Sequence, residues 1–320
     1  MGTLLGVQIQ VVRDFDEQIG FIERVQPPIG KIIQDNEPFL SRAKEVSPDT
    51  VWVGRVWVAD QQWQPAHQRA IEHRDRILRT GITRKVNYWT GQNEPYPYNG
   101  NHVPVAEFVT ELAQLLHAEG LKYIGFNWSV GVPHIPDWGH PAMLEAVQAC
   151  DAIGVHEYSA PNVNQAESFD PRVDDLESYI TSGWHCLRYR RAYAKLREHL
   201  SADQIPPWFI GECGVDGGIW EPFPGKQQGG WKPNLNDNYE LYIEQLGWYD
   251  RQLQMDTGGD RPRILGATPF LWGCNDDWTS FDLLRPREAS EAFGQYIIDH
   301  KEKALPTGWI DMRDKLAAQT

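Results

Sequence analysis

A repeated alternation of short apolar runs and amphipathic stretches is the feature that most restricts the fold of this 320-residue chain. Each of eight runs rich in β-branched and aromatic residues is followed by a stretch with helical periodicity. Because the runs are mostly continuous, both faces of each strand are expected to be buried, as in a parallel sheet. The strands are expected at 3–11, 29–33, 51–58, 85–89, 123–128, 152–158, 208–211 and 264–271, and the helices at 14–25, 38–46, 65–80, 103–119, 141–150, 184–200, 238–255 and 287–300.

Eight consecutive βα units without a linker or a break in composition predict a closed (β/α)8 TIM barrel, a single domain over residues 1–320. The weakest strand signal is 29–33, which Pro27 and Pro28 shorten. Active sites in this fold lie at the carboxyl ends of the strands, in the loops that lead to the helices. Functional residues are therefore expected where the strands end.

The charge balance restricts the class of partner. Thirty basic and forty-four acidic residues give a net charge of −14, which argues against a nucleic acid or an anionic membrane, because both bind a positive face. A neutral ligand such as a sugar fits this balance. No apolar run reaches the ~18 residues of a membrane span, and no basic-then-apolar leader precedes the first strand. The chain is expected to be cytoplasmic, or secreted if a leader has been removed.

The spacing of potential metal ligands predicts neither a metal site nor a cofactor. The four cysteines (Cys150, Cys186, Cys213 and Cys274) match no zinc-ligand pattern and are expected to be reduced, buried and small apolar residues. A metal site could use Asp276, Asp277 or His156, but no set of His, Asp and Glu residues stands at standard ligand spacing.

Two stretches of similar design place a glutamate at the end of a strand. Asn93-Glu94-Pro95 follows the fourth expected strand, and Gly211-Glu212 closes the seventh. Either glutamate alone is typical of a solvated strand end. The two strands are three apart around an eight-strand ring, however, so both side chains can face each other across the mouth of the barrel. Two carboxyl groups facing each other across a sugar bond, one ionised and one protonated, are the catalytic groups of a glycosidase.

This ordered pair of motifs, Asn-Glu-Pro on strand four and Gly-Glu-x-Gly on strand seven, resembles those of the clan A glycoside hydrolases, which are retaining (β/α)8 enzymes. The resemblance implies that Glu94 is the acid/base, that Asn93 binds the substrate 2-hydroxyl and that Glu212 is the nucleophile. It does not indicate a family within the clan.

Two further positions match the same pattern. Val155-His156-Glu157-Tyr158 ends strand six, where the clan often has an aromatic residue or a histidine that touches the nucleophile, so Tyr158 or His156 would serve. Trp272 follows strand eight, where the clan commonly has a tryptophan at the floor of the sugar-binding subsite. Glu157 itself alternates with its neighbours and is expected to point between strand and helix.

Three other residues are candidate substrate contacts. The clan usually has an arginine on strand two, whereas Arg55 lies on the third expected strand. Either the strand count is wrong early in the chain, or Arg55 makes a different contact. Asn127 and Trp128 end strand five and are plausible sugar contacts, although a buried tryptophan would give the same pattern.

The stretch 215–235 contains Trp220, Phe223 and Trp231 among many glycines and prolines. A loop of this length is usually functional or disordered, and its aromatic side chains favour a substrate-binding loop over a self-packed surface loop. Asp276-Asp277-Trp278, after strand eight, is open to the same two interpretations.

These patterns together predict a retaining glycoside hydrolase that cleaves a β-linked oligo- or polysaccharide by double displacement, without a cofactor. Its expected partner is a carbohydrate substrate, with no nucleic acid and no membrane, and the sequence predicts no particular oligomeric state. One alternative on the same fold is a metal-dependent sugar isomerase or epimerase. Another is a barrel that binds carbohydrate without cleaving it.

Overall fold

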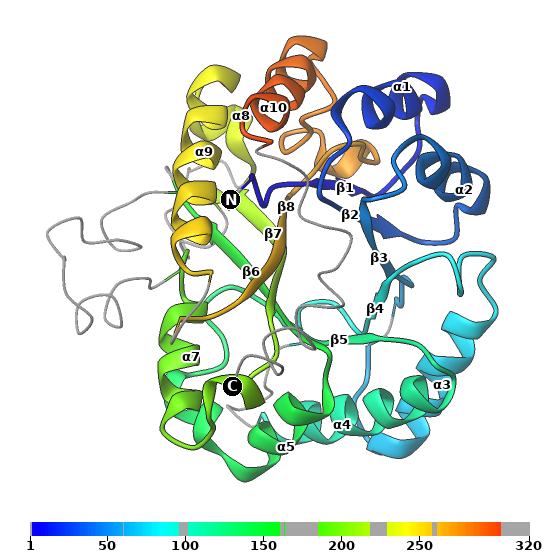
Figure 1. The fold of residues 1–320 in the computed structure, drawn as a ribbon, viewed down its shortest axis with the longest axis vertical. Coiled ribbons are helices and arrows are strands. Elements are labelled where there is room, and N and C mark those ends of the chain that lie inside the picture. The colour runs from blue at the N-terminus through cyan, green and yellow to red at the C-terminus, as the bar shows by residue number, and fades with distance from the viewer. Residues whose placement is uncertain are drawn as a thin grey trace, which may run out of the picture.

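A computed structural model describes residues 2–59, 61–95, 102–160, 163, 185–217, 229–257 and 261–301. These residues form eight parallel strands whose order around the sheet follows their order in the chain (Figure 1). The strands are β1 (Val7–Ile9), β2 (Ile29–Ile33), β3 (Val51–Arg55), β4 (Tyr88–Thr90), β5 (Tyr123–Trp128), β6 (Ala152–Ser159), β7 (Trp208–Val215) and β8 (Ile264–Pro269).

The first and last strands meet and close the ring. Leu5 and Ala267 form a parallel bridge, in which the amide of Gly6 donates to Ala267 O and the amide of Ala267 donates to Leu4 O, both at 2.8 Å. The predicted (β/α)8 barrel is therefore confirmed for the described residues. The expected extent of 1–320 stays a prediction, because 302–320 lie outside them.

Helices surround the ring of strands (Figure 1). Several helices have an Asp or Asn side chain as N-cap. The Asp14 side chain accepts from the Glu17 amide at the start of α1, and the Asn238 side chain accepts from the Leu241 amide at the start of α9. The helices are α1 (Phe15–Val25), α2 (Glu37–Val46), α3 (Ala66–Leu78), α4 (Val103–Ala118), α5 (Pro141–Ala149), α7 (Tyr189–Arg197), α8 (Trp231–Asn234), α9 (Tyr239–Met255) and α10 (Arg287–Asp299), with 3-10 turns at Ile135–Gly139, Ala202–Gln204 and Asp276–Trp278.

Tryptophans packed on glycines join neighbouring strands. Trp52 on β3 lies beside Gly30 on β2, where a Cβ atom would come within 2.5 Å of the indole. Trp89 on β4 covers Gly54 on β3 in the same way, at 2.9 Å. Both indoles are buried in the apolar cluster that joins the strands to the helices.

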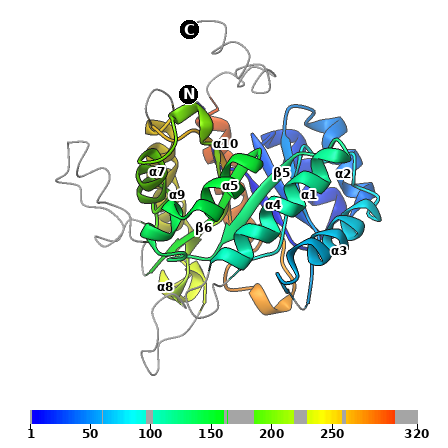
Figure 2. The same ribbon diagram turned by 90° about the horizontal axis from the view of Figure 1, so that it is seen from below.

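The loops that follow the strands lie at one end of the barrel. Figure 2 shows α8, which follows β7, at one end and the N-terminus at the other. The loops that follow the strands therefore share the end marked by α8.

All four cysteines lie in described ranges, and they are free and buried, as expected. Within the described ranges, no helix has the length and apolar character needed to cross a membrane.

Candidate active site

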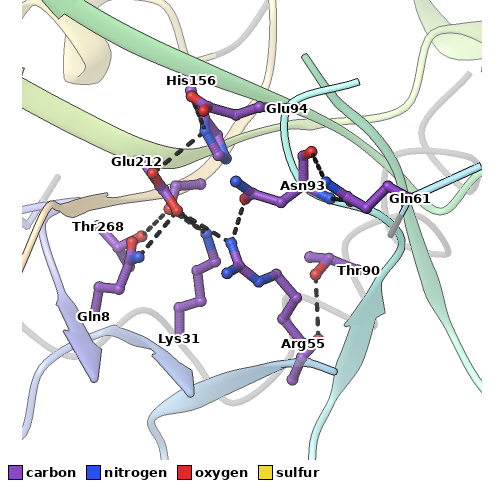
Figure 3. Close-up of polar contacts among 12 residues, drawn as sticks. Gln8, Lys31, Arg55, Gln61, Thr90, Asn93, Glu94, His156, Glu212 and Thr268 are labelled. Carbon is purple, nitrogen blue, oxygen red and sulfur yellow. Dashed lines mark hydrogen bonds and ion pairs between the residues drawn. The ribbon is translucent and has the colours of Figure 1, made fainter. Parts of the chain in front are cut away.

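Glu212 is buried inside the barrel and accepts hydrogen bonds from four other strands. Figure 3 shows the donors Gln8, Lys31 and Arg55. Its Oε1 accepts from Gln8 Nε2 on β1 at 3.0 Å, from Lys31 Nζ on β2 at 3.0 Å and from Arg55 Nη1 on β3 at 3.3 Å. Its Oε2 accepts from the Tyr158 hydroxyl on β6 at 2.9 Å. The barrel thus brings together donors that are far apart in the sequence.

The charges around Glu212 decide its protonation state. Burial by itself would raise the pKa of this carboxyl group, but the electrostatic effects of His156, Lys31 and Arg55 together outweigh burial and hold its pKa well below the usual range. An ionised carboxylate in a fixed orientation can act as a nucleophile.

Glu94 lies in the loop beyond Thr90, the last residue of β4, rather than at the strand end itself. Its backbone has a φ of 45°, a left-handed conformation that is uncommon outside glycine. The Glu94 amide donates to the Asn127 carbonyl at 3.0 Å, and this bond holds the loop in place. The side chain of Glu94 is 36% exposed, so it faces the open end of the site, in contrast to the buried Glu212.

His156 joins the two carboxylates. Its Nδ1 lies 3.0 Å from Oε1 of Glu94 and 3.4 Å from Oε2 of Glu212 (Figure 3). One potential ligand atom from each of these three residues lies within 4.8 Å of the other two, so the glutamates approach at least that closely. The carboxyl groups are about 5–5.5 Å apart in retaining glycosidases and about 6.5–9.5 Å apart in inverting ones.

The same three residues could also hold a metal ion, although the sequence had predicted no ligand set. They come from separate parts of the chain, and only the barrel assembles them. Lys31 and Arg55 already contact Glu212, and their positive charges oppose a cation at this position.

Asn93 is held from two sides. Arg55 Nη1 donates to its Oδ1, and Gln61 accepts from its amide while donating to its carbonyl at 2.8 Å (Figure 3). Arg55 lies on β3, so the expected strand count is correct and this arginine makes a contact of its own, to both Asn93 and Glu212. Lys31 is the cation on strand two.

Sequence reasoning did not select Lys31, Gln8 or Gln61. A signal existed for Lys31, because a lysine in the middle of the apolar run Ile29–Ile33 has to be buried and therefore needs a partner. Gln8 has the same signal in β1. Gln61 lies in the loop after β3, and nothing in its surroundings distinguishes it from other loop residues.

The side chain of Trp272 packs against helices rather than in the site, contrary to expectation. Its ring is fully buried against Phe21 of α1, with centroids 4.4 Å apart, and its Nε1 donates to Ser290 Oγ of α10 at 2.9 Å. The tryptophan therefore packs between strand and helices rather than at the mouth. Phe270 instead contacts the ring of Tyr158, at 6.3 Å between centroids.

The two candidates on β5 have mainly structural contacts. Asn127 is buried and supports the Glu94 loop through its main-chain carbonyl. Its Oδ1 would lie 2.5 Å from a Cβ atom on Gly154 of β6. Trp128 is fully buried and stacks on Phe126, with centroids 5.8 Å apart. The arrangement thus favours a buried tryptophan over an exposed sugar contact.

Two further predictions concern residues that pack against α9. Glu157 points between strand and helix as expected, and accepts from the Tyr249 hydroxyl of α9 at 2.6 Å. Trp231 is buried and stacks on Tyr242 at 5.3 Å, so it packs in the core rather than on a substrate-binding loop. Trp220 and Phe223 lie outside the described residues.

Comparison with known proteins supports the fold. No protein-family model matches the chain, and no curated protein matches it. Among solved structures, a β-glucuronidase from Faecalibacterium prausnitzii has a TM-score of 0.53 at 12% identity, covering 96% of this chain and 49% of its own. An endo-β1,6-glucanase has a TM-score of 0.52 at 10% identity, covering 96% of this chain and 76% of its own. A calcium-binding mutant of Bacteroides uniformis β-glucuronidase 2 has a TM-score of 0.51 at 11% identity, covering 88% and 32%.

These likenesses show a shared barrel fold at low sequence identity. All three structures carry the names of glycoside hydrolases. The chain spans about half the length of the Faecalibacterium prausnitzii β-glucuronidase that it resembles.

Proposed function

We propose that this protein is a retaining glycoside hydrolase that acts on a β-linked oligo- or polysaccharide through Glu212 and Glu94. One observation carries the proposal: an oxygen of the Glu94 carboxylate lies within 4.8 Å of an oxygen of the Glu212 carboxylate, and the two groups have very different surroundings. Glu212 is buried among cationic side chains, whereas Glu94 is partly exposed beside His156. Such a pair can divide the roles of nucleophile and acid/base between its members. The glycosidase names of the similar structures support the same reading.

In the first step a carboxylate oxygen of Glu212 forms a bond to the anomeric carbon, and the bond from that carbon to the leaving oxygen breaks. Protonated Glu94 gives its proton to the leaving oxygen, so the aglycone departs as an alcohol and Glu94 becomes ionised. Asn93 would bind the sugar 2-hydroxyl, in the orientation that Arg55 and Gln61 impose on it.

In the second step ionised Glu94 takes a proton from a water molecule, whose oxygen bonds to the anomeric carbon. The ester bond to Glu212 breaks at the same carbon, which restores the Glu212 carboxylate and leaves Glu94 protonated. Two inversions at one carbon give net retention.

The test is a panel of 4-nitrophenyl β-glycosides and β-linked polysaccharides, assayed with wild type, Glu94→Gln and Glu212→Gln. We expect each variant to lose about 10²–10⁴-fold or more in turnover on any substrate that wild type cleaves. Glu23→Gln, on the exposed face of α1, is the matched control. A 2-fluoro glycoside trap with peptide mapping should label Glu212. Unchanged turnover in both Gln variants, or an inverted product, would remove this mechanism.

The metal-dependent isomerase remains a second candidate because Glu94, His156 and Glu212 could share an ion. A chelator separates the two readings. Activity that disappears fully in EDTA and returns with a divalent cation would favour the isomerase, whereas the glycosidase should be indifferent. Binding of oligosaccharide without any turnover by wild type would instead indicate a non-catalytic carbohydrate-binding barrel.

A further inference from the structure

Lys31 crosses the interior of the barrel from β2 to β7. Its side chain is fully buried, and its Nζ donates to the Gly211 carbonyl at 2.9 Å and to Glu212 Oε1 at 3.0 Å (Figure 3). The ammonium group therefore contacts both the main chain that precedes Glu212 and the carboxylate itself. Thr268 Oγ1 donates to the same Gly211 carbonyl at 2.8 Å, which further restrains this part of β7.

The two oxygens of Glu212 have unequal surroundings. Oε1 accepts three hydrogen bonds, from Gln8, Lys31 and Arg55, whereas a carboxylate oxygen has about two lone-pair sites. Oε2 accepts from the Tyr158 hydroxyl and lies toward His156, which in turn contacts Glu94. Oε1 is thus fully occupied by the protein, and Oε2 is the oxygen on the side of the second carboxylate.

The charge of Lys31 depends on its neighbours from three other elements. Burial lowers the pKa of Lys31 to about 8, the negative charge of Glu212 on β7 opposes this change, and Arg55 on β3 adds to it. Glu94, in the loop after β4, also favours the charged form. The ammonium form therefore prevails at neutral pH and is lost in mildly alkaline solution.

We propose that Lys31 is a positioning residue whose ammonium group, bonded to Oε1 of Glu212 and to the Gly211 carbonyl, holds the carboxylate so that Oε2 is the oxygen that attacks. The part that concerns attack rests on the proposed glycosidase function. The electrostatic coupling between Lys31 and Glu212 does not depend on it.

The coupling can be measured without any substrate. Protein labelled with ¹³C and ¹⁵N in lysine is titrated by NMR at the side-chain Cε and Nζ. We expect one lysine to titrate near pH 8, its signal to be absent from Lys31→Arg, and its midpoint to fall in Glu212→Gln, because the attracting charge is gone. Lys44→Arg, on α2, is the control that should leave this signal in place. A Lys31 signal whose midpoint does not move in Glu212→Gln would overturn the coupling.

The catalytic role is tested on a 2,4-dinitrophenyl glycoside of whichever sugar the nitrophenyl panel identifies. This leaving group departs without an acid, so in a Glu94→Ala background the pH profile of the glycosylation step no longer reports Glu94. We expect an alkaline limb near pH 8 to persist there and to move to higher pH with Lys31→Arg, since guanidinium stays charged. Lys31→Met should lower kcat about 10–100-fold below pH 8 with little change in KM, given the hydrogen bond to a charged group that it removes, and its activity should approach that of wild type above pH 8.

The outcomes separate the two proposals. An alkaline limb that Lys31→Arg leaves in place would overturn the positioning role while the glycosidase assignment stands. Failure of wild type to hydrolyse any glycoside would overturn the proposed function, and the NMR titration would still decide the coupling of Lys31 to Glu212. Circular dichroism and thermal unfolding of each variant identify any that fails to fold, and in that case Lys31→Arg carries the test.

Discussion

Replacing Glu157 by glutamine should change how the stability of this protein depends on pH. The Glu157 side chain is buried on the helix side of β6, and burial raises its pKa to about 7. Three donors oppose that change: the Tyr249 hydroxyl and the amides of Tyr189 and Leu187. Glutamine has nearly the same shape but cannot ionise, so the comparison isolates the titration of one carboxyl group.

The magnitude follows from the difference between the folded and unfolded pKa values of Glu157. Between the ordinary 4.5 and about 7, the unfolded chain has released this proton while the folded chain keeps it. Because the folded state binds more protons, the stability contributed by Glu157 is complete below pH 4.5 and falls as pH rises to about 7. The pKa difference corresponds to about 3 kcal/mol. The unfolding free energy of wild type minus that of Glu157→Gln should decrease by this amount.

Urea unfolding followed by tryptophan fluorescence, at intervals from about pH 4 to pH 8, measures the free energies. The control is Glu23→Gln on the exposed face of α1, which should track wild type at every pH. If the unfolding free energy of wild type minus that of Glu157→Gln stays constant or increases with pH, the reasoning is refuted. It would mean that the three donors hold Glu157 ionised in the folded protein against the effect of burial.

Three other substitutions test the site and the packing. Tyr158→Phe removes the hydrogen bond to the ionised Glu212 and should lower kcat by about 10–100-fold, given ~1.5–3 kcal/mol for a bond to a charged group; steady-state kinetics showing full activity would contradict this. Trp272→Phe should lower the free energy of unfolding by ~1–3 kcal/mol without changing KM, because the indole packs in the core, and a large rise in KM would return it to a sugar subsite. Gly54→Ala should cost ~1–3 kcal/mol in chemical denaturation because its Cβ would lie 2.9 Å from the Trp89 ring. The matched Gly20→Ala, with nothing within 4 Å of its Cβ, should not destabilise, and equal losses at both positions would contradict the packing argument.

Strand existence and order were predictable because they depend on local patterns. The apolar runs at 29–33 and 123–128 coincide with β2 and β5. This includes β2, for which Pro27 and Pro28 shorten the sequence signal. The predicted end of β7 at residue 211 was wrong, because the strand continues to Val215 and Glu212 lies inside it rather than at its end. Pairing with β6 extends the strand, and that pairing cannot be read from the residues of β7 alone.

The tryptophans show a second limit. Trp272 and Trp231 were expected to touch substrate, but both are buried against helices. A tryptophan in the sequence has a large apolar surface that is stabilised by contact either with a sugar ring or with a neighbouring helix. Which of these covers it depends on the direction in which the strand end turns.

By itself the sequence determined the eightfold βα alternation and the two motifs that contain Glu94 and Glu212, because periodicity and chain breaks act over a few residues. Only the tertiary structure decided that Gln8, Lys31 and Arg55 converge on one oxygen of Glu212. Those contacts arise from strand register around a closed ring, where residues far apart in the chain come within hydrogen-bonding distance. The concentration of positive charge around the Glu212 carboxylate is therefore a property of the barrel.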